Sequence, residues 1–108
     1  MKMVKALISR GQIDAITASL SSLGISGMTL CEVKCPADEN VLYRAVDSPL
    51  YESKVMIEIA ISDDRVGQLV HILSGRDFDP ELAVDKICVL DIQESIRIRT
   101  GEKNDSSL

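Results

Sequence analysis

One pattern of apolar residues occurs twice along this chain in the same order, and it constrains the fold more than any other feature. Each copy consists of a strand-like run, a stripe with helical spacing and a second strand-like run. The elements lie at residues 3–8, 13–23 and 28–33 in the first copy, and at 55–61, 66–73 and 86–90 in the second. Two successive β-α-β units predict a duplicated α+β sandwich of the ferredoxin-like type, with both helices on one face of an antiparallel sheet.

Residues at the ends of the two helical stripes mark where the helices begin and end. Gly24 follows the first stripe and Gly75 follows the second, where a left-handed residue commonly terminates a helix. Ser62 precedes the second stripe as a candidate N-cap. Asp63 and Asp64 place negative charge in the first turn, where the helix dipole favours it. These residues support the two predicted helices.

Two connections are long for so small a sandwich. Most loops in compact domains have about four to six residues, and loops beyond about 12–15 tend to be functional or disordered. The connection at residues 34–53 exceeds that length, and the connection at 76–85 approaches it. We therefore expect a ligand-responsive switch with two functional loops and no buried enzyme pocket.

Near the end of the chain, residues 95–102 alternate isoleucine with arginine. As a short fifth strand, this octet places Ile96 and Ile98 on one face and Arg97 and Arg99 on the other. The two guanidinium groups would then emerge about 6.6 Å apart. That spacing suits a polyanion such as a nucleotide polyphosphate, since each guanidinium can hold several oxygens. The alternative is a solvated edge strand, whose charges discourage pairing with another sheet.

Composition limits the possible partners. The 108 residues carry a net charge of −5, which argues against nucleic acid, and only two Tyr and one Phe are available for base stacking.

No apolar run approaches the ~20 residues of a membrane span, and the first residues lack a signal-peptide pattern. We expect a cytoplasmic protein without membrane insertion, formed by one domain at residues 1–102 and a mobile polar tail at 103–108.

Other candidate chemistry is weak. Cys31 and Cys35 would lie about 13 Å apart on one extended strand, too far for a shared zinc ion or a disulfide, and could meet only if the strand ends before Cys35. Cys88 falls within an apolar strand and is interpreted as a small hydrophobic residue. His71 is the only histidine, and no catalytic triad, carboxylate pair or phosphate-binding Walker pattern accompanies it. We predict neither an enzyme nor a metal centre.

Over nearly its whole length, the chain resembles the PII signal-transduction proteins and their PII-like relatives. The matching stretches are residues 1–8, 27–34, 54–59 and 86–90, and then Ile96-Arg97-Ile98-Arg99-Thr100-Gly101-Glu102. The resemblance implies a homotrimer that binds ATP or ADP in clefts between subunits. It also implies that the first long loop is a T-loop, which regulates a transporter or enzyme target, and that the second is a B-loop, which wraps phosphates.

The same resemblance implies roles for individual residues. Thr29 and the strand from Glu58 to Ala60 would border the adenine. Lys86, Arg97 and Arg99 would contact the phosphates. Lys54 would lie at the base of the T-loop, near a second ligand.

The chain also departs from the family pattern. The family's Gly-Asp-Gly-Lys is replaced by Ala83-Val84-Asp85-Lys86, after an acidic insert at residues 77–81. This change favours ADP or AMP over ATP, because a triphosphate is repelled most. Glu39 opposes 2-oxoglutarate, so bicarbonate becomes a candidate second ligand. Ser48 occupies the position of the tyrosine that some relatives have uridylylated. The alternative function is a metal-binding or metal-tolerance trimer of similar fold.

Overall fold

The computed structural model describes residues 1–25, 27–36, 51–74 and 86–108. These residues form four strands and two α-helices: β1 (Lys2–Ile8), α1 (Ile13–Ser22), β2 (Thr29–Pro36), β3 (Tyr51–Ile61), α2 (Val66–Ser74) and β4 (Lys86–Asp91). Three short 3₁₀ helices accompany them: η1 (Arg10–Gln12), η3 (Asp63–Arg65) and η5 (Asn104–Ser107).

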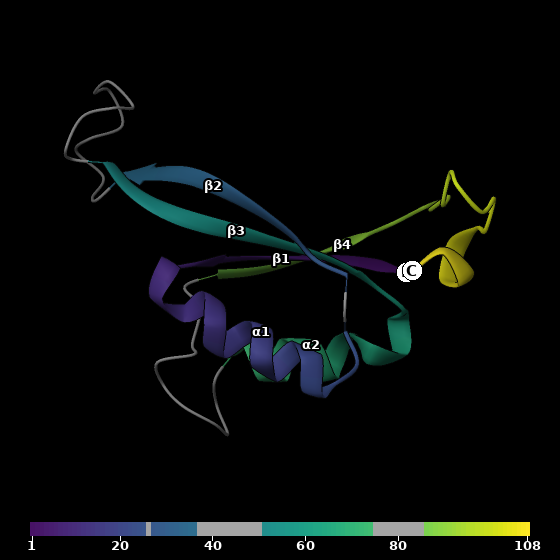
Figure 1. Cartoon of the computed structure of the whole chain (residues 1–108), viewed down its shortest axis with the longest axis horizontal. Coiled ribbons are helices and arrows are strands. Elements are labelled where there is room, and N and C mark those ends of the chain that lie inside the picture. Colours follow the sequence, from purple (N-terminus) through teal and green to yellow (C-terminus); the bar gives the residue numbers. More distant parts are fainter. Residues whose placement is uncertain (26, 37–50, 75–85) are drawn as a thin grey trace.

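The four strands form one antiparallel sheet in the order β2-β3-β1-β4. Both α-helices lie against the same face of this sheet (Figure 1). The predicted ferredoxin-like α+β sandwich is therefore confirmed, with the helices on the predicted face.

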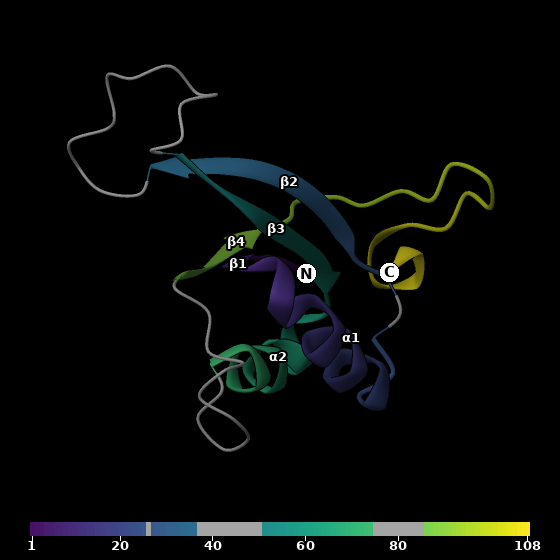
Figure 2. The same cartoon turned by 60° about the vertical axis from the view of Figure 1, so that its left-hand side comes forward.

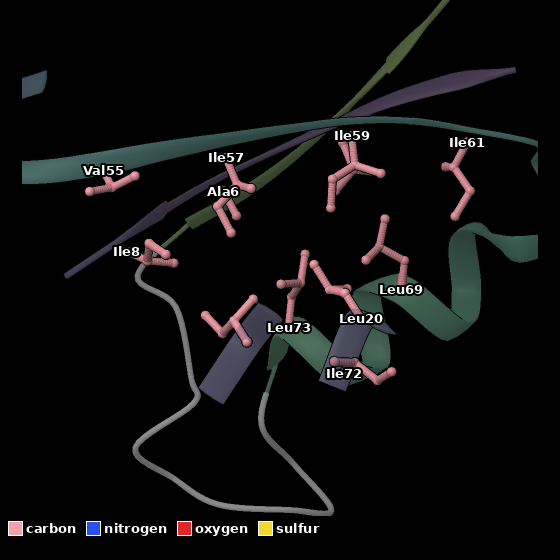
Figure 3. Close-up of a cluster of buried hydrophobic side chains, with 12 residues drawn as sticks. Ala6, Ile8, Leu20, Val55, Ile57, Ile59, Ile61, Leu69, Ile72 and Leu73 are labelled. Atoms are coloured by element: carbon pink, nitrogen blue, oxygen red, sulfur yellow. The ribbon is translucent and has the colours of Figure 1, made fainter. Parts of the chain in front are cut away.

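The core is formed by the buried side chains that alternate with more exposed ones along the strands. On β3, every second residue from Val55 to Ile61 is buried, while the residues between them face the other side of the sheet. The buried side chains of β1 and β3 meet those of the helices, among them Leu20 of α1 and Leu69 of α2 (Figure 3). Leu69 is completely buried, with 0% of its surface exposed. The core is aliphatic, as the scarcity of aromatic residues requires.

The helix ends follow the sequence signals. Gly24 adopts a φ of +75° after α1. Its N–H donates to the carbonyl of Ser21, and the N–H of Ile25 donates to the carbonyl of Leu20, at 3.0 Å each. This pair of bonds is a Schellman motif, the helix ending that favours glycine. At the second helix, Ser62 is the extended residue before η3, which leads directly into α2.

The strands beside the first long connection run further than the sequence predicts. β2 continues to Pro36, and β3 begins at Tyr51, which pairs with Pro36. The sequence did not predict this extension because the added residues are mostly polar. Two paired strands can continue beyond the core with exposed side chains on both faces, so no apolar alternation marks them. The predictions for Glu39 and Ser48, and those for Gly75 and residues 76–85, lie outside the described residues.

The fifth strand predicted for residues 95–102 is wrong. Among the described residues, the only β pairing of this octet is an isolated bridge between Ile96 and Lys103. A turn follows the bridge, in which Gly101, at a φ of +75°, donates its N–H to the Arg97 carbonyl at 2.8 Å. Gly101 provides the left-handed backbone conformation that closes this turn, so the alternating pattern does not persist as a strand.

The last residues form a short helix, which their polar composition does not predict. Asn104–Ser107 form η5, and the Asn104 N–H donates to the Ser95 carbonyl at 2.7 Å. Ser107 is 8% exposed. Figure 2 shows this segment, in yellow, folded back beside the end of the sheet where β2 begins.

Candidate functional site

One pocket gathers four of the seven ligand-binding residues that the sequence resemblance implies. It has a volume of about 370 Å³ and lies at the end of the sheet where β1 begins and β3 ends. Thr29 of β2 pairs with Glu58 of β3, and Ala60 lies two residues further along the same strand. Arg97 reaches the pocket from the C-terminal segment, residues 92–108. Three strand positions and one arginine thus converge although they are far apart in sequence.

The pocket lies on the face of the sheet that the helices leave open. Thr29, Glu58 and Ala60 all point to this side, because their neighbours Ile57, Ile59 and Ile61 point into the core. Glu58 forms an ion pair with Lys5 of β1, with 3.4 Å between Nζ and Oε1. The Glu58 carboxylate is therefore partly neutralised, which lowers its repulsion toward an anionic ligand in the pocket.

Arg97 is held by its backbone and by its side chain. Its N–H donates to the Glu102 carbonyl at 2.8 Å, which fixes the start of the turn. Its guanidinium donates twice to the Ser107 carbonyl oxygen, from Nε at 3.2 Å and from Nη2 at 2.9 Å. Arginine commonly holds a phosphate through two parallel hydrogen bonds to two oxygens, and the same pair of donors here meets a single carbonyl oxygen.

The remaining three predicted residues lie elsewhere. Lys54 pairs with Val33 and is six residues from Ala60 along β3, about 20 Å away. Lys86 begins β4 and pairs with Leu7, whereas Arg97 lies beyond the opposite end of that strand. Arg99 lies in the turn after Arg97 and does not line the pocket. One chain therefore supplies two separate groups of predicted ligand residues.

Sequence reasoning missed several residues of the pocket. Met3 lines it from β1, and Ser95, Ser107 and Leu108 line it from the C-terminal segment. The alternation of β1 places Met3 on the open face, so its position could have been found from the strand pattern. No comparable signal marks Ser107, because its burial depends on η5 folding back onto the sheet.

The cysteines do not form a site in the part of the chain that the structure describes. β2 includes both Cys31 and Cys35, so they are separated by about 13 Å of extended strand, and the condition under which they could meet is not fulfilled. Cys88 is exposed on β4, an edge strand of the sheet. Among the described residues, no three His, Cys, Asp or Glu side chains are grouped as metal ligands. Likewise, none of the described helices is long and apolar enough to cross a membrane.

Comparisons with known proteins match nearly the whole chain to one family. The family model "Nitrogen regulatory protein P-II" matches residues 1–102. The chain is 35% identical to the nitrogen regulatory protein GlnK of Escherichia coli strain K12, over all of both chains. It is 33% identical to the nitrogen regulatory protein P-II of Pasteurella multocida and 34% identical to the nitrogen regulatory protein P-II 1 of Escherichia coli, again over the full length of both chains.

Proposed function

Because this chain belongs to the PII family of nitrogen regulatory proteins, we propose that it is a signal-transduction protein that binds adenine nucleotides and regulates a protein target. The observation that carries the proposal is the convergence of Thr29, Glu58, Ala60 and Arg97 on one pocket. The strand residues provide a wall for the adenine ring, and Arg97 provides a cation for the phosphates.

The site is shared between subunits in this proposal. A ligand in the pocket cannot reach Lys54 of the same chain, which is about 20 Å away along β3. Lys86 is also separated from Arg97, by the length of β4. In a homotrimer, a neighbouring subunit can bring its own Lys54 and Lys86 to the phosphates held by Arg97. A cleft between two subunits requires that each chain carry one part of the site at each end of its sheet, as this chain does.

The open face of the sheet supports the trimer. Met3 and Leu7 of β1 and Met56 of β3 share this face with the Lys5–Glu58 ion pair. Leu90 of β4 lies there too and is 44% exposed. A sheet face that carries apolar side chains, with no helix of the described residues over it, is stabilised by a partner sheet. Closed three-fold association would bury it.

The sequence supports the choice of ligands. The acidic residues at 77–81 and the loss of the family's glycines favour ADP or AMP over ATP. Glu39 disfavours the dianion 2-oxoglutarate, so a small monoanion such as bicarbonate is the proposed second ligand, beside Lys54. We propose a cytoplasmic regulator, not an enzyme, whose segment at residues 37–50 contacts a transporter or an enzyme.

Calorimetry with the Arg97→Ala variant tests the nucleotide site. Removing a charge-assisted phosphate contact costs about 1.5–3 kcal/mol, so the Kd for ADP should rise at least tenfold. Lys103→Ala is the matched control, because it removes one positive charge from the same segment without altering the lining of the pocket. Unchanged ADP affinity in Arg97→Ala contradicts the proposed site, and bicarbonate that leaves ADP affinity unchanged contradicts the proposed second ligand.

A further inference from the structure

Residues 104–108 occupy the part of the pocket in which Arg97 would meet a phosphate. The Ser107 carbonyl accepts both guanidinium hydrogen bonds. Ser107 and Leu108 line the same cavity as Thr29, Glu58 and Ala60. The donors of Arg97 that face this segment are therefore already engaged before any ligand arrives.

A small number of hydrogen bonds holds this segment in place. The Ser107 hydroxyl donates to the Asn104 carbonyl and shares a hydrogen bond with the Ser95 hydroxyl, at 2.7 Å each. The Asn104 N–H donates to the Ser95 carbonyl at 2.7 Å. Asn104 itself has a φ of +56°, a left-handed conformation that asparagine adopts more readily than most other residues. A single short 3₁₀ helix with few anchors has low local stability and can open without unfolding the sheet.

A phosphate is a better acceptor for Arg97 than the Ser107 carbonyl. A phosphate adds a charge–charge attraction to its hydrogen bonds with the guanidinium, whereas the Ser107 carbonyl carries no net charge. A phosphate oxygen can therefore replace the carbonyl at the same two donors. An uncharged nucleoside offers no such replacement.

We propose that residues 104–108 are an autoinhibitory plug, which the phosphates of a bound nucleotide displace from Arg97. The inference rests on the proposed function, since it concerns the same site. It makes the release of the plug a second output of nucleotide binding, at the end of the sheet opposite the one where β2 ends and β3 begins (Figure 1). It also predicts that the pocket distinguishes a nucleotide from adenosine, because only the nucleotide can displace the segment.

Calorimetry on the intact protein and its variants tests the plug. Deleting residues 104–108 should tighten ADP binding about tenfold, because no binding energy is then spent on displacement. Ser95→Ala, which removes one anchor, should tighten it about threefold. Ser22→Ala is the control, because the Ser22 hydroxyl bonds only within α1. Equal or weaker ADP binding after the deletion overturns the plug, because the segment then contributes nothing or holds the nucleotide.

Hydrogen exchange separates the plug from the proposed function. Without ligand, Arg97→Ala should accelerate amide exchange at residues 104–108, which tests the contact independently of binding. ADP and inorganic pyrophosphate should accelerate it in the intact protein, whereas adenosine should not. Slower exchange with ADP overturns displacement. If neither the intact nor the shortened protein binds ADP, the proposed function fails and the plug fails with it. If both bind equally, only the plug fails.

Discussion

Gly24 is the residue whose backbone most clearly determines a helix boundary. Its φ of +75° lies in the left-handed region, where any side chain is strained. We expect Gly24→Ala to lower the free energy of unfolding by about 1 kcal/mol, as measured by urea denaturation. Gly11→Ala is the matched control, because Gly11 has no positive φ and a Cβ there meets nothing within 4 Å. Equal stability of the two variants would show that the Schellman ending does not depend on glycine.

Arg97 shows what sequence reasoning can find at the residue scale. Its charge and its place in the octet predict a role in anion binding, and Arg97 lines the pocket. Its geometry was not predictable, because the turn depends on Gly101 and on the Ser107 carbonyl ten residues away. A period of two describes side-chain alternation only while the backbone stays extended. For the same reason Arg99, its predicted partner, is directed elsewhere.

The elements that bury apolar side chains were predictable. Both α-helices and the central strands appear near their expected bounds, because one face of each must be covered. The end of β2 and the start of β3 were not predictable. Their paired residues lie beyond the core and give no apolar pattern in the sequence. The C-terminal η5 was missed because its stability comes from contacts with Ser95 and Arg97, and not from its own composition.

Leu69 tests the packing between α2 and the sheet. It is completely buried, so Leu69→Ala leaves a cavity among aliphatic neighbours that can close it only partly. The free energy of unfolding should fall by about 2–5 kcal/mol in urea denaturation. Ile98→Ala, at a residue that is 91% exposed, should change it by less than about 0.5 kcal/mol. A small effect at Leu69 would mean that α2 does not pack on the sheet as described.

At the scale of the whole molecule, the proposed ligand residues of one chain are divided between the two ends of its sheet. In the proposed site, Arg97 and the strand residues beside it form one half, and Lys54 and Lys86 form the other. A chain that cannot associate would keep each half intact and still lack a complete site. Assembly and nucleotide binding should therefore be lost together, although no variant residue touches the nucleotide.

Met56 lies on the open face of the sheet, opposite Leu7 and outside the pocket, and allows this coupling to be tested. A carboxylate buried between sheets without a partner is strongly unfavourable, so Met56→Glu should convert the proposed trimer to monomers. Light scattering should report this change, and calorimetry should show loss of ADP binding with an unchanged circular dichroism spectrum. Ala18→Glu, on the exposed side of α1, adds the same charge and should leave both properties intact. If monomeric Met56→Glu binds ADP with full affinity, then the site is complete within one chain, and Lys54 and Lys86 of a neighbour have no part in it.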